Sequence, residues 1–330
     1  MTNKHRTVWV IVLADGDSDA IRVGVPGAHA ARVWPPKPYR LRNGGPSLLQ
    51  ALVRRAVDLV PRERIVVVVN RADRRYWEAQ LSGSNPWSAV VQPEHRGTGF
   101  SVLLPLLVIA RIDPTAMVVV LSSHHDAQDD DMLAAALRHA AAMEGTDCDR
   151  LTMLCTSTTA PDPGLGYLNS PAVSGVGMRP DVSHFEESSR ELTARLLQAS
   201  SGWKTGIFSG CLQAVLNLYP RHVPGLLRNL QAVVKYWADP RVPSSKLEQL
   251  YAHHPAIDFW HDVLRLQPAR VHFLAVPRAC TDVSTLGTAR RNDARSVPGL
   301  DPLAPALSDT HAVEVTSARN PAHPVSWAHV

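Results

Sequence analysis

The sequence lacks several features that would quickly place it in a class. No apolar run approaches the roughly 20 residues that a membrane span needs, and the N-terminal MTNKHR leads directly into a predicted strand. We therefore expect neither a transmembrane segment nor a signal peptide. The four cysteines form no CxxC pair and are widely spaced: Cys148, Cys155, Cys211 and Cys280. This spacing argues against structural zinc and a disulfide scaffold, and we expect a reduced, cytoplasmic protein.

Charge is sparse and scattered. The 330 residues carry a net charge of +4 without the 15 histidines, and the isoelectric point is about 9.0. Nucleic-acid binding calls for a concentrated basic stripe, which the sequence does not show. The small positive net charge is equally compatible with binding of an anionic small molecule. Because 45% of the residues are hydrophobic, a chain of this length can bury a sizeable core.

Apolar, β-branched runs alternate with helical patterns in the first half of the chain. The runs predict buried strands at 8–13, 64–70, 89–92, 116–121 and 151–156. Helices are predicted between them at 46–60, 71–81, 100–111 and 129–143. This order predicts the α/β class, with a mostly parallel sheet and right-handed crossovers. Ligands of such sheets bind at the carboxyl ends of the strands, which here are the loops at 14–20, 70, 92–99 and 121–126.

The second half is less regular. A Gly-rich turn at 162–168 leads into a predicted strand, and further strands are expected to end near Glu187 and to span 271–276. Helices are predicted at 190–199, 212–219, 224–235, 246–251 and 259–266. From about residue 288 the pattern dissolves into Ala, Pro, Ser and Arg, so we expect a poorly ordered tail over 289–330.

Several motifs, in their order and spacing, resemble those of the sugar nucleotidyltransferases, specifically the mannose-1-phosphate guanylyltransferase branch. They are GGPSLLQ (44–50), VVQPEHRGTG (90–99), VVVLSSHH (118–125), DPGLGYL (162–168), WKTGIF (203–208) and PAIDFWHDVL (255–264). The resemblance covers about residues 8–288. It implies a Rossmann-like sheet of the nucleotide-diphospho-sugar transferase type, with a nucleotide side over 1–150 and a smaller sugar-side subdomain over 151–288.

The same resemblance implies an activity and the residues for it. The activity is transfer of GMP from GTP to mannose 1-phosphate, giving GDP-mannose and pyrophosphate, with Mg²⁺ held by carboxylates. The nucleotide-binding matches are Leu13, Ala14, Gly16, Gln92, Gly97 and Thr98; the sugar-binding matches are Gly166, Glu187 and Lys204; the catalytic matches are Lys37 and Asp282, of which Asp282 is also the metal-binding match. A Gln side chain and a closely approaching Gly backbone suit hydrogen bonds to a base edge.

The chain departs from the family pattern at several charged positions. Asp15 and Ser18 stand where the first loop has Gly, and Ala20 stands where it has Arg. His124 occupies the place of the first metal-binding Asp, and Mg²⁺ prefers oxygen ligands. Ser188 replaces the Lys that neutralises the sugar phosphate.

These departures leave open whether the lost charges are compensated. Arg22 could replace the loop Arg, and Lys204 could replace the sugar-side Lys. For Asp15, Asp17 and Asp19, a solvated acidic loop is favoured over a cation loop, because the Gly and Glu of a calcium loop are missing. Asp258 matches an acidic position near the site that is more often structural than catalytic.

Two hypotheses follow. The first is a nucleotidyltransferase with an altered site that uses a nucleoside triphosphate and a sugar 1-phosphate. The second is a catalytically inactive homologue that binds a nucleotide or nucleotide sugar, or pairs with an active paralogue. A weaker third, a glycosyltransferase-like use of the fold, needs an Asp-x-Asp at a strand end, and the run Asp15–Asp19 follows the wrong strand. We expect no nucleic-acid or membrane partner, and a homo-oligomer is compatible with either main hypothesis.

Overall fold

The computed structural model describes residues 6–15, 22–23, 32–33, 35–41, 45–81, 88–122, 125–127, 134, 137–138, 148–156, 166–169, 184–187, 202–276 and 280–282. The predicted tail over 289–330 and most of the predicted helix over 129–143 lie outside the described residues, and so does the predicted helix over 190–199. The site candidates Gly16 and His124 also lie outside them.

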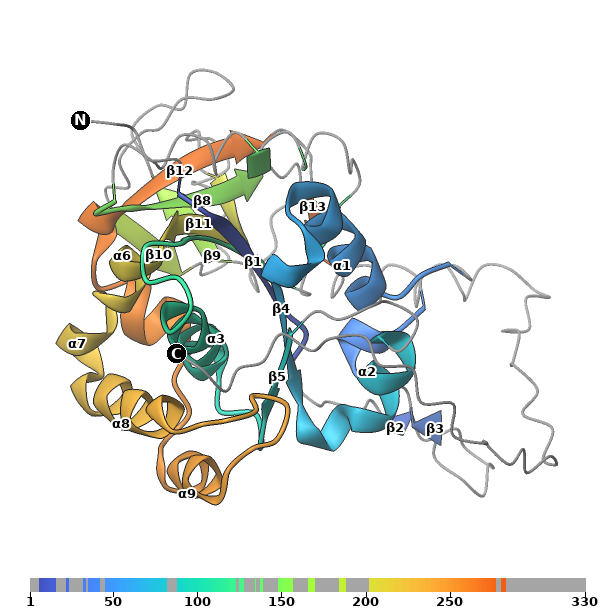
Figure 1. Cartoon of the computed structure of the whole chain (residues 1–330). Helices are drawn as coiled ribbons and strands as arrows, with labels where there is room; N and C mark the ends of the chain where they lie inside the picture. Colours follow the sequence, from blue (N-terminus) through green and yellow to red (C-terminus); the bar gives the residue numbers. More distant parts are fainter. Residues whose placement is uncertain are drawn as a thin grey trace, which may run out of the picture.

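A parallel sheet forms the centre of the molecule (Figure 1). Its strands, in spatial order, are β6 (Met117–Ser122), β1 (Val8–Leu13), β4 (Ile65–Asn70) and β5 (Ser88–Gln92). Each neighbouring pair in this group is parallel. All six residues of β4 and of β6 are buried, as expected for parallel strands that helices cover on both faces. The predicted α/β fold with a parallel sheet is confirmed.

Helices cover the two faces of this sheet. They include α1 (Leu48–Leu59), α2 (Arg74–Leu81) and α3 (Thr98–Ala110). Successive side chains of a strand point to opposite faces: Trp9, Ile11 and Leu13 pack in the same apolar cluster as α3. Val10 and Val12 pack with α1 and α2 on the other face. Figure 1 shows α3 on one side of β1 and β4, and α1 with α2 on the other.

The second half extends the same sheet with mostly antiparallel strands. They are β8 (Leu151–Thr156), β9 (Gly166–Asn169), β10 (His184–Glu187), β11 (Gly202–Cys211) and β12 (Val271–Val276). β11 pairs antiparallel with β6, and β12 pairs parallel with β8. Within the described residues this makes one nine-stranded sheet. Strands from both sides of residue 150 belong to this one sheet, so the division into 1–150 and 151–288 stays a prediction.

Most of the remaining elements are short. The strand pairs are β2 (Arg22–Val23) with β3 (Arg32–Val33), and β7 (His125–Ala127) with β13 (Cys280–Asp282). The longer helices are α8 (Pro224–Lys235) and α9 (Ser245–His253), and the single turns are η1 (Lys37–Tyr39), η2 (Arg62–Arg64), η3 (Arg71–Asp73), the π-helical η4 (Phe259–Leu264) and η5 (Pro268–Arg270). Among the described residues, no helix combines the length and apolar character needed to cross a membrane.

The helix predicted over 212–219 is corrected by the structure. The segment forms α6 (Leu212–Leu216) and then, after a turn, α7 (Tyr219–His222). Pro220 lies in the first turn of α7. Proline lacks the N–H that a helix interior needs but fits the first turn of a new helix. The chain therefore starts a second helix at this point instead of continuing the first.

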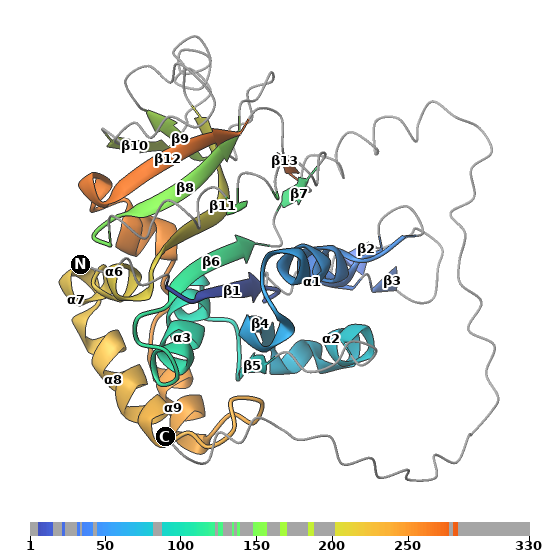
Figure 2. The same cartoon turned by 45° about the horizontal axis from the view of Figure 1, so that its top comes forward.

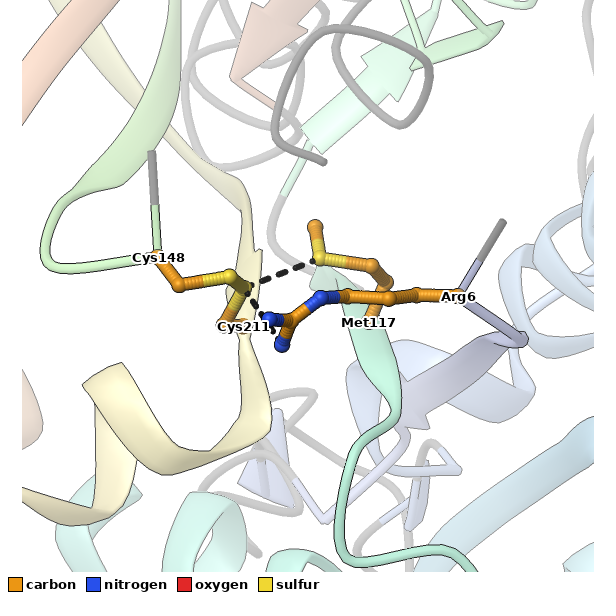
Figure 3. The surroundings of a disulfide bond; sticks show 4 residues. All are labelled: Arg6, Met117, Cys148 and Cys211. Atoms are coloured by element: carbon orange, nitrogen blue, oxygen red, sulfur yellow. Dashed lines mark hydrogen bonds between the residues drawn. A yellow bond between two sulfur atoms is a disulfide. The ribbon is translucent and has the colours of Figure 1, made fainter. Parts of the chain in front are cut away.

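Cys148 and Cys211 form a disulfide (Figure 3), so the expectation that these thiols are reduced is wrong. The two Cα atoms are 5.2 Å apart although 63 residues separate them. Cys211 ends β11 and Cys148 lies just before β8, and these strands pair with Gly210 opposite Leu151. Wide spacing along the chain did not exclude this contact, because strand pairing sets the distance.

If this disulfide forms in solution, reduction should raise the number of free thiols and lower the stability of the fold. Titration of the denatured protein without reductant should find two fewer thiols than after reduction. Reduction should lower the free energy of unfolding by about 2–4 kcal/mol, because a loop of this length gains entropy in the unfolded chain. Denaturant melts measure this change, and the melt of a Cys211→Ser variant should not respond to reductant. An equal thiol count in both samples would contradict the bond.

Candidate functional site

The carboxyl ends of the parallel strands meet at one edge of the sheet. Leu13 at the end of β1 is opposite both Val68 of β4 and Ser122 of β6. Asn70 at the end of β4 is opposite Gln92 at the end of β5. The segments that follow these strands are therefore neighbours, as the α/β pattern predicts.

Lys37 is held beside the end of β1 by its neighbour Tyr39. The Tyr39 hydroxyl donates a hydrogen bond of 2.7 Å to the Ala14 carbonyl oxygen and is buried. Gln80 donates to the Tyr39 carbonyl, and the Tyr39 ring stacks on Tyr76. Burial raises the pKa of Tyr39 well above its ordinary value, so it stays a neutral donor. Lys37, two residues before Tyr39 in η1, is partly exposed.

Asp15 directs its carboxylate into the protein at this edge. The residue is 4% exposed, and its Oδ2 accepts hydrogen bonds from Gln92 Nε2 and Ser101 Oγ. His95 Nδ1 lies 3.6 Å from the same oxygen. The Gln92 amide also donates to Ser101 Oγ and accepts from the Tyr251 hydroxyl at 2.8 Å. The prediction of a solvated acidic loop is therefore wrong for Asp15, because polar groups from distant segments enclose its side chain.

The charge of Asp15 is maintained by this network. Burial alone would raise its pKa, but the nearby His95 and the hydrogen bonds from Ser101 and Gln92 outweigh burial and lower it. Hydrogen bonds to a charged group favour the charged form. Asp15 is therefore a carboxylate at neutral pH, close to the end of β1 where the family's loop has glycine.

Two further acceptors lie next to Asp15 at the end of β4. Asn70 Nδ2 donates to the Asp15 carbonyl oxygen at 3.1 Å. Among the residues that the structure describes, Asn70 Oδ1 and Asp73 Oδ2 have no hydrogen-bond partner, and the two residues are only 1% and 5% exposed. Burial raises the pKa of Asp73, although a hydrogen bond from Asn70 and the charge of Arg75 oppose this effect. An unpaired buried acceptor costs free energy, so this corner favours a donor.

The loop after β5 is clamped to η4. Gly97 has φ +83°, and the Gly99 N–H donates to the Ile257 carbonyl oxygen at 2.8 Å. Thr98 Oγ1 donates to Asp258 Oδ2 and accepts from the Phe259 N–H. Asp258 also caps η4, because its side chain accepts from the His261 N–H. Asp258 therefore has a structural role here, because it links the β5 loop to the start of η4.

The nucleotide-binding roles of Gln92 and Thr98 stay predictions. The side chains of both residues are hydrogen-bonded within the protein. A base or ribose would have to compete with these partners or use other groups of the same loop.

For the sugar-binding and metal-binding candidates, strand pairing shows which residues lie opposite one another. Gly166 of β9 is directly opposite Glu187 of β10, and Lys204 of β11 is opposite Cys155 of β8. Asp282 is opposite His125. Figure 2 shows their strands, β13 and β7, just beyond the end of β6.

The predicted magnesium site does not fit the donors that this chain offers. Asp282 reaches the end of β6, but the residues that follow this strand are Ser123, His124 and His125. Mg²⁺ prefers an octahedron of oxygen ligands, and histidine nitrogen is a poor replacement. Arg22, a candidate for the lost loop charge, pairs by its backbone with Val33.

Sequence reasoning missed several residues of this edge. Apart from Thr98 at its start, Ser101 is the one polar residue of the apolar helix α3, and such a residue is a signal for a buried hydrogen bond. Asp73 and Tyr39 carried no special pattern. Tyr251 is 159 residues from Gln92, and no local feature of a helical tyrosine reveals such a partner.

A separate cavity of about 640 Å³ lies between α2, β5 and the α8–α9 connection. Three arginines line it, and each forms an ion pair with an acidic residue; the pairs are Arg71–Glu248, Arg74–Glu78 and Arg241–Asp239. These carboxylates neutralise the arginines, so the cavity is a weaker candidate for a phosphate site than the edge beside Lys37.

Comparisons with known proteins identify the fold. No protein-family model and no curated protein matches the sequence. A solved structure described as a mannose-1-phosphate geranyltransferase from Thermus thermophilus superposes with a TM-score of 0.69 at 22% identity, over 84% of this chain and 76% of that one. One described as a mannose-6-phosphate isomerase from Helicobacter pylori gives 0.65 at 16% identity, over 84% and 100%.

A third, described as a putative glucose-1-phosphate thymidylyltransferase from Bacillus anthracis, gives a TM-score of 0.51 at 13% identity, over 90% and 98%. At these identities the similarity establishes a shared fold, the nucleotide-diphospho-sugar transferase type that the sequence predicts.

Proposed function

We propose that this protein, which has the fold of the sugar nucleotidyltransferases, transfers a nucleotidyl group to a sugar 1-phosphate. GMP from GTP and mannose 1-phosphate are the substrates that its sequence motifs favour. The observation that carries the proposal is the position of Lys37. Tyr39, two residues after Lys37, donates a hydrogen bond to Ala14 at the carboxyl end of β1, and an open α/β sheet binds its ligand at this end.

The chemistry is an in-line displacement. A phosphate oxygen of the sugar 1-phosphate attacks the α-phosphorus, a new P–O bond forms, and the bond to the departing pyrophosphate breaks. The protein contributes mainly position and charge in such a reaction. The Lys37 ammonium would stabilise the negative charge on the phosphate oxygens.

A second candidate function is nucleotide or nucleotide-sugar binding without turnover. The Asp15 carboxylate favours it, because this buried negative charge stands where a triphosphate loop uses glycine. Its charge repels phosphate, and it accepts a hydrogen bond from the Gln92 amide that a base would otherwise receive. The loss of the loop Arg at Ala20 and of the metal Asp at His124 points the same way.

A pyrophosphate assay tests the proposal. Purified protein is incubated with mannose 1-phosphate, Mg²⁺ and one of GTP, ATP, CTP, UTP or dTTP. Pyrophosphate release that requires both substrates is the expected result. No release with any triphosphate, together with nucleotide binding by calorimetry, would reject turnover and leave the binding function. In that case an Ala20→Arg, His124→Asp double variant should gain activity if those two losses are responsible.

A further inference from the structure

The two cysteines of the Cys148–Cys211 disulfide lie in different surroundings. Cys148 is in a turn just before β8 and is partly exposed. Cys211, at the end of β11, is only 1% exposed. Thiol–disulfide exchange begins when a thiolate attacks one of the two sulfur atoms, and access to each sulfur helps to decide which one reacts. The difference in exposure therefore favours attack at Cys148.

Two side chains cover Cys211 on the side away from Cys148. The Cys211 Sγ lies 3.3 Å from the Met117 Sδ and accepts a hydrogen bond of 3.3 Å from Arg6 Nη1. Figure 3 shows Cys148 on one side of Cys211, with Arg6 and Met117 on the other. A thiolate has to approach a disulfide sulfur from the side opposite its bonded partner, because the S–S bond breaks as the new bond forms. At Cys211 this approach is obstructed.

Arg6 also places a positive charge where exchange at Cys148 would need one. When a thiolate attacks the Cys148 Sγ, Cys211 leaves as a thiolate. A neighbouring cation stabilises a cysteine thiolate, and a more stable thiolate leaves faster. Arginine is always charged in proteins, and Arg6 already donates to this sulfur. Burial, obstruction and charge therefore all assign Cys148 as the attacked residue and Cys211 as the leaving group.

We propose that this disulfide is a site of reversible thiol exchange, at which a small external thiol modifies Cys148. In the first step the thiolate RS⁻ bonds to the Cys148 Sγ, and the electron pair of the S–S bond goes to the Cys211 Sγ. A mixed disulfide then remains at Cys148. A second RS⁻ attacks the external sulfur of this adduct, forms RSSR and releases Cys148 as a thiolate. Two external thiols are thus oxidised for each protein disulfide that is reduced, and attack by Cys211 on the adduct reverses the first step.

The exchange site is separate from Cys155 and from the candidate functional site. Cys155 is 1% exposed, and burial raises the pKa of its thiol well above the usual range, so it is a poor nucleophile. Cys211 is opposite Met117, the first residue of β6. The candidate site lies at the other end of this strand, beside Ser122. The inference therefore goes beyond the proposed function and holds whether or not the protein releases pyrophosphate.

Mass mapping of the folded protein tests which sulfur is attacked. The oxidised protein is exposed briefly to mercaptoethanol, capped with N-ethylmaleimide and digested. The expected early product carries mercaptoethanol on Cys148 and maleimide on Cys211. In denaturant this preference should disappear, because it arises from the fold. An adduct mainly on Cys211, equal adducts on both residues, no exchange in the folded protein, or the same preference in denaturant would overturn the proposal.

The variant Arg6→Gln tests the leaving group. The rate at which mercaptoethanol opens the disulfide of the folded protein should fall by about threefold or more, because the Cys211 thiolate loses its cation. Arg6→Lys should retain most of the rate. Arg54→Gln is the matched control, because it removes an exposed arginine of α1, and it should react at the wild-type rate.

A purely structural role of Arg6 would have the opposite effect on the rate. Loss of a structural contact would loosen this edge of the sheet, expose the disulfide and speed its reduction. An unchanged or faster rate in Arg6→Gln would therefore overturn the proposal. In denaturant all four proteins should react at the same rate, which shows that the difference depends on the folded contact between Arg6 and Cys211.

Discussion

A Gly97→Ala variant should lose about 3 kcal/mol or more of its free energy of unfolding. Gly97 has φ +83° and ψ 165°, a region that is essentially restricted to glycine and costs other residues about 1–3 kcal/mol. An added Cβ would also lie 2.3 Å from the Ile257 carbonyl oxygen and 2.8 Å from its carbon. These are backbone atoms, so no side-chain rotation relieves the clash, and the loop must separate from η4.

Denaturant melts of the two proteins measure this loss. Gly225→Ala is the matched control, because Gly225 lies in the first turn of α8 and an added Cβ there meets nothing within 4 Å. Alanine in a helix is favoured over glycine by roughly 0.5–1 kcal/mol, so the control should be as stable as the wild type or slightly more stable. A Gly97→Ala protein with wild-type stability would show that the β5 loop does not pack on Ile257 in this way.

A Lys37→Met variant should lose about 10²–10³-fold in kcat for pyrophosphate release, under the proposed function. Removing one preorganised charge from a transition-state site typically has an effect of this size. Methionine keeps the length and the apolar stem of lysine, so the change removes little except the ammonium group. The folding stability should change little, because Tyr39 and not Lys37 makes the described contact with Ala14.

The control for this variant is Lys246→Met, which removes an exposed lysine from the first turn of α9. Its kcat should match that of the wild type. If Lys37→Met also retains wild-type kcat while the wild type releases pyrophosphate, Lys37 does not stabilise the transition state, and another cation must. If Lys37→Met unfolds at a lower temperature, the loss of activity has to be measured at a temperature where both proteins are folded.

The sequence by itself determined the parallel core and the edge at which the site lies. The runs at 8–13, 64–70 and 116–121 are apolar and β-branched, and helical patterns separate them. The spacing of apolar residues in strands and helices is set by the local backbone geometry, so it can be recognised without knowledge of the tertiary structure. Topology then follows from general rules, since parallel strands need crossovers and place their carboxyl ends together. The match at Pro36-Lys37 also depended on local sequence alone.

Only the tertiary structure decided how the polar residues of this edge are used. An acidic, Gly-containing loop predicts solvent exposure, yet Asp15 is buried because Gln92, Ser101 and His95 approach it from residues about 80 positions away. Tyr251 reaches Gln92 across 159 residues, and Cys148 reaches Cys211 across 63. Such contacts leave no periodic trace in the sequence, because they depend on how separate elements pack. The charge and hydrogen bonding of Asp15 are therefore properties of the fold.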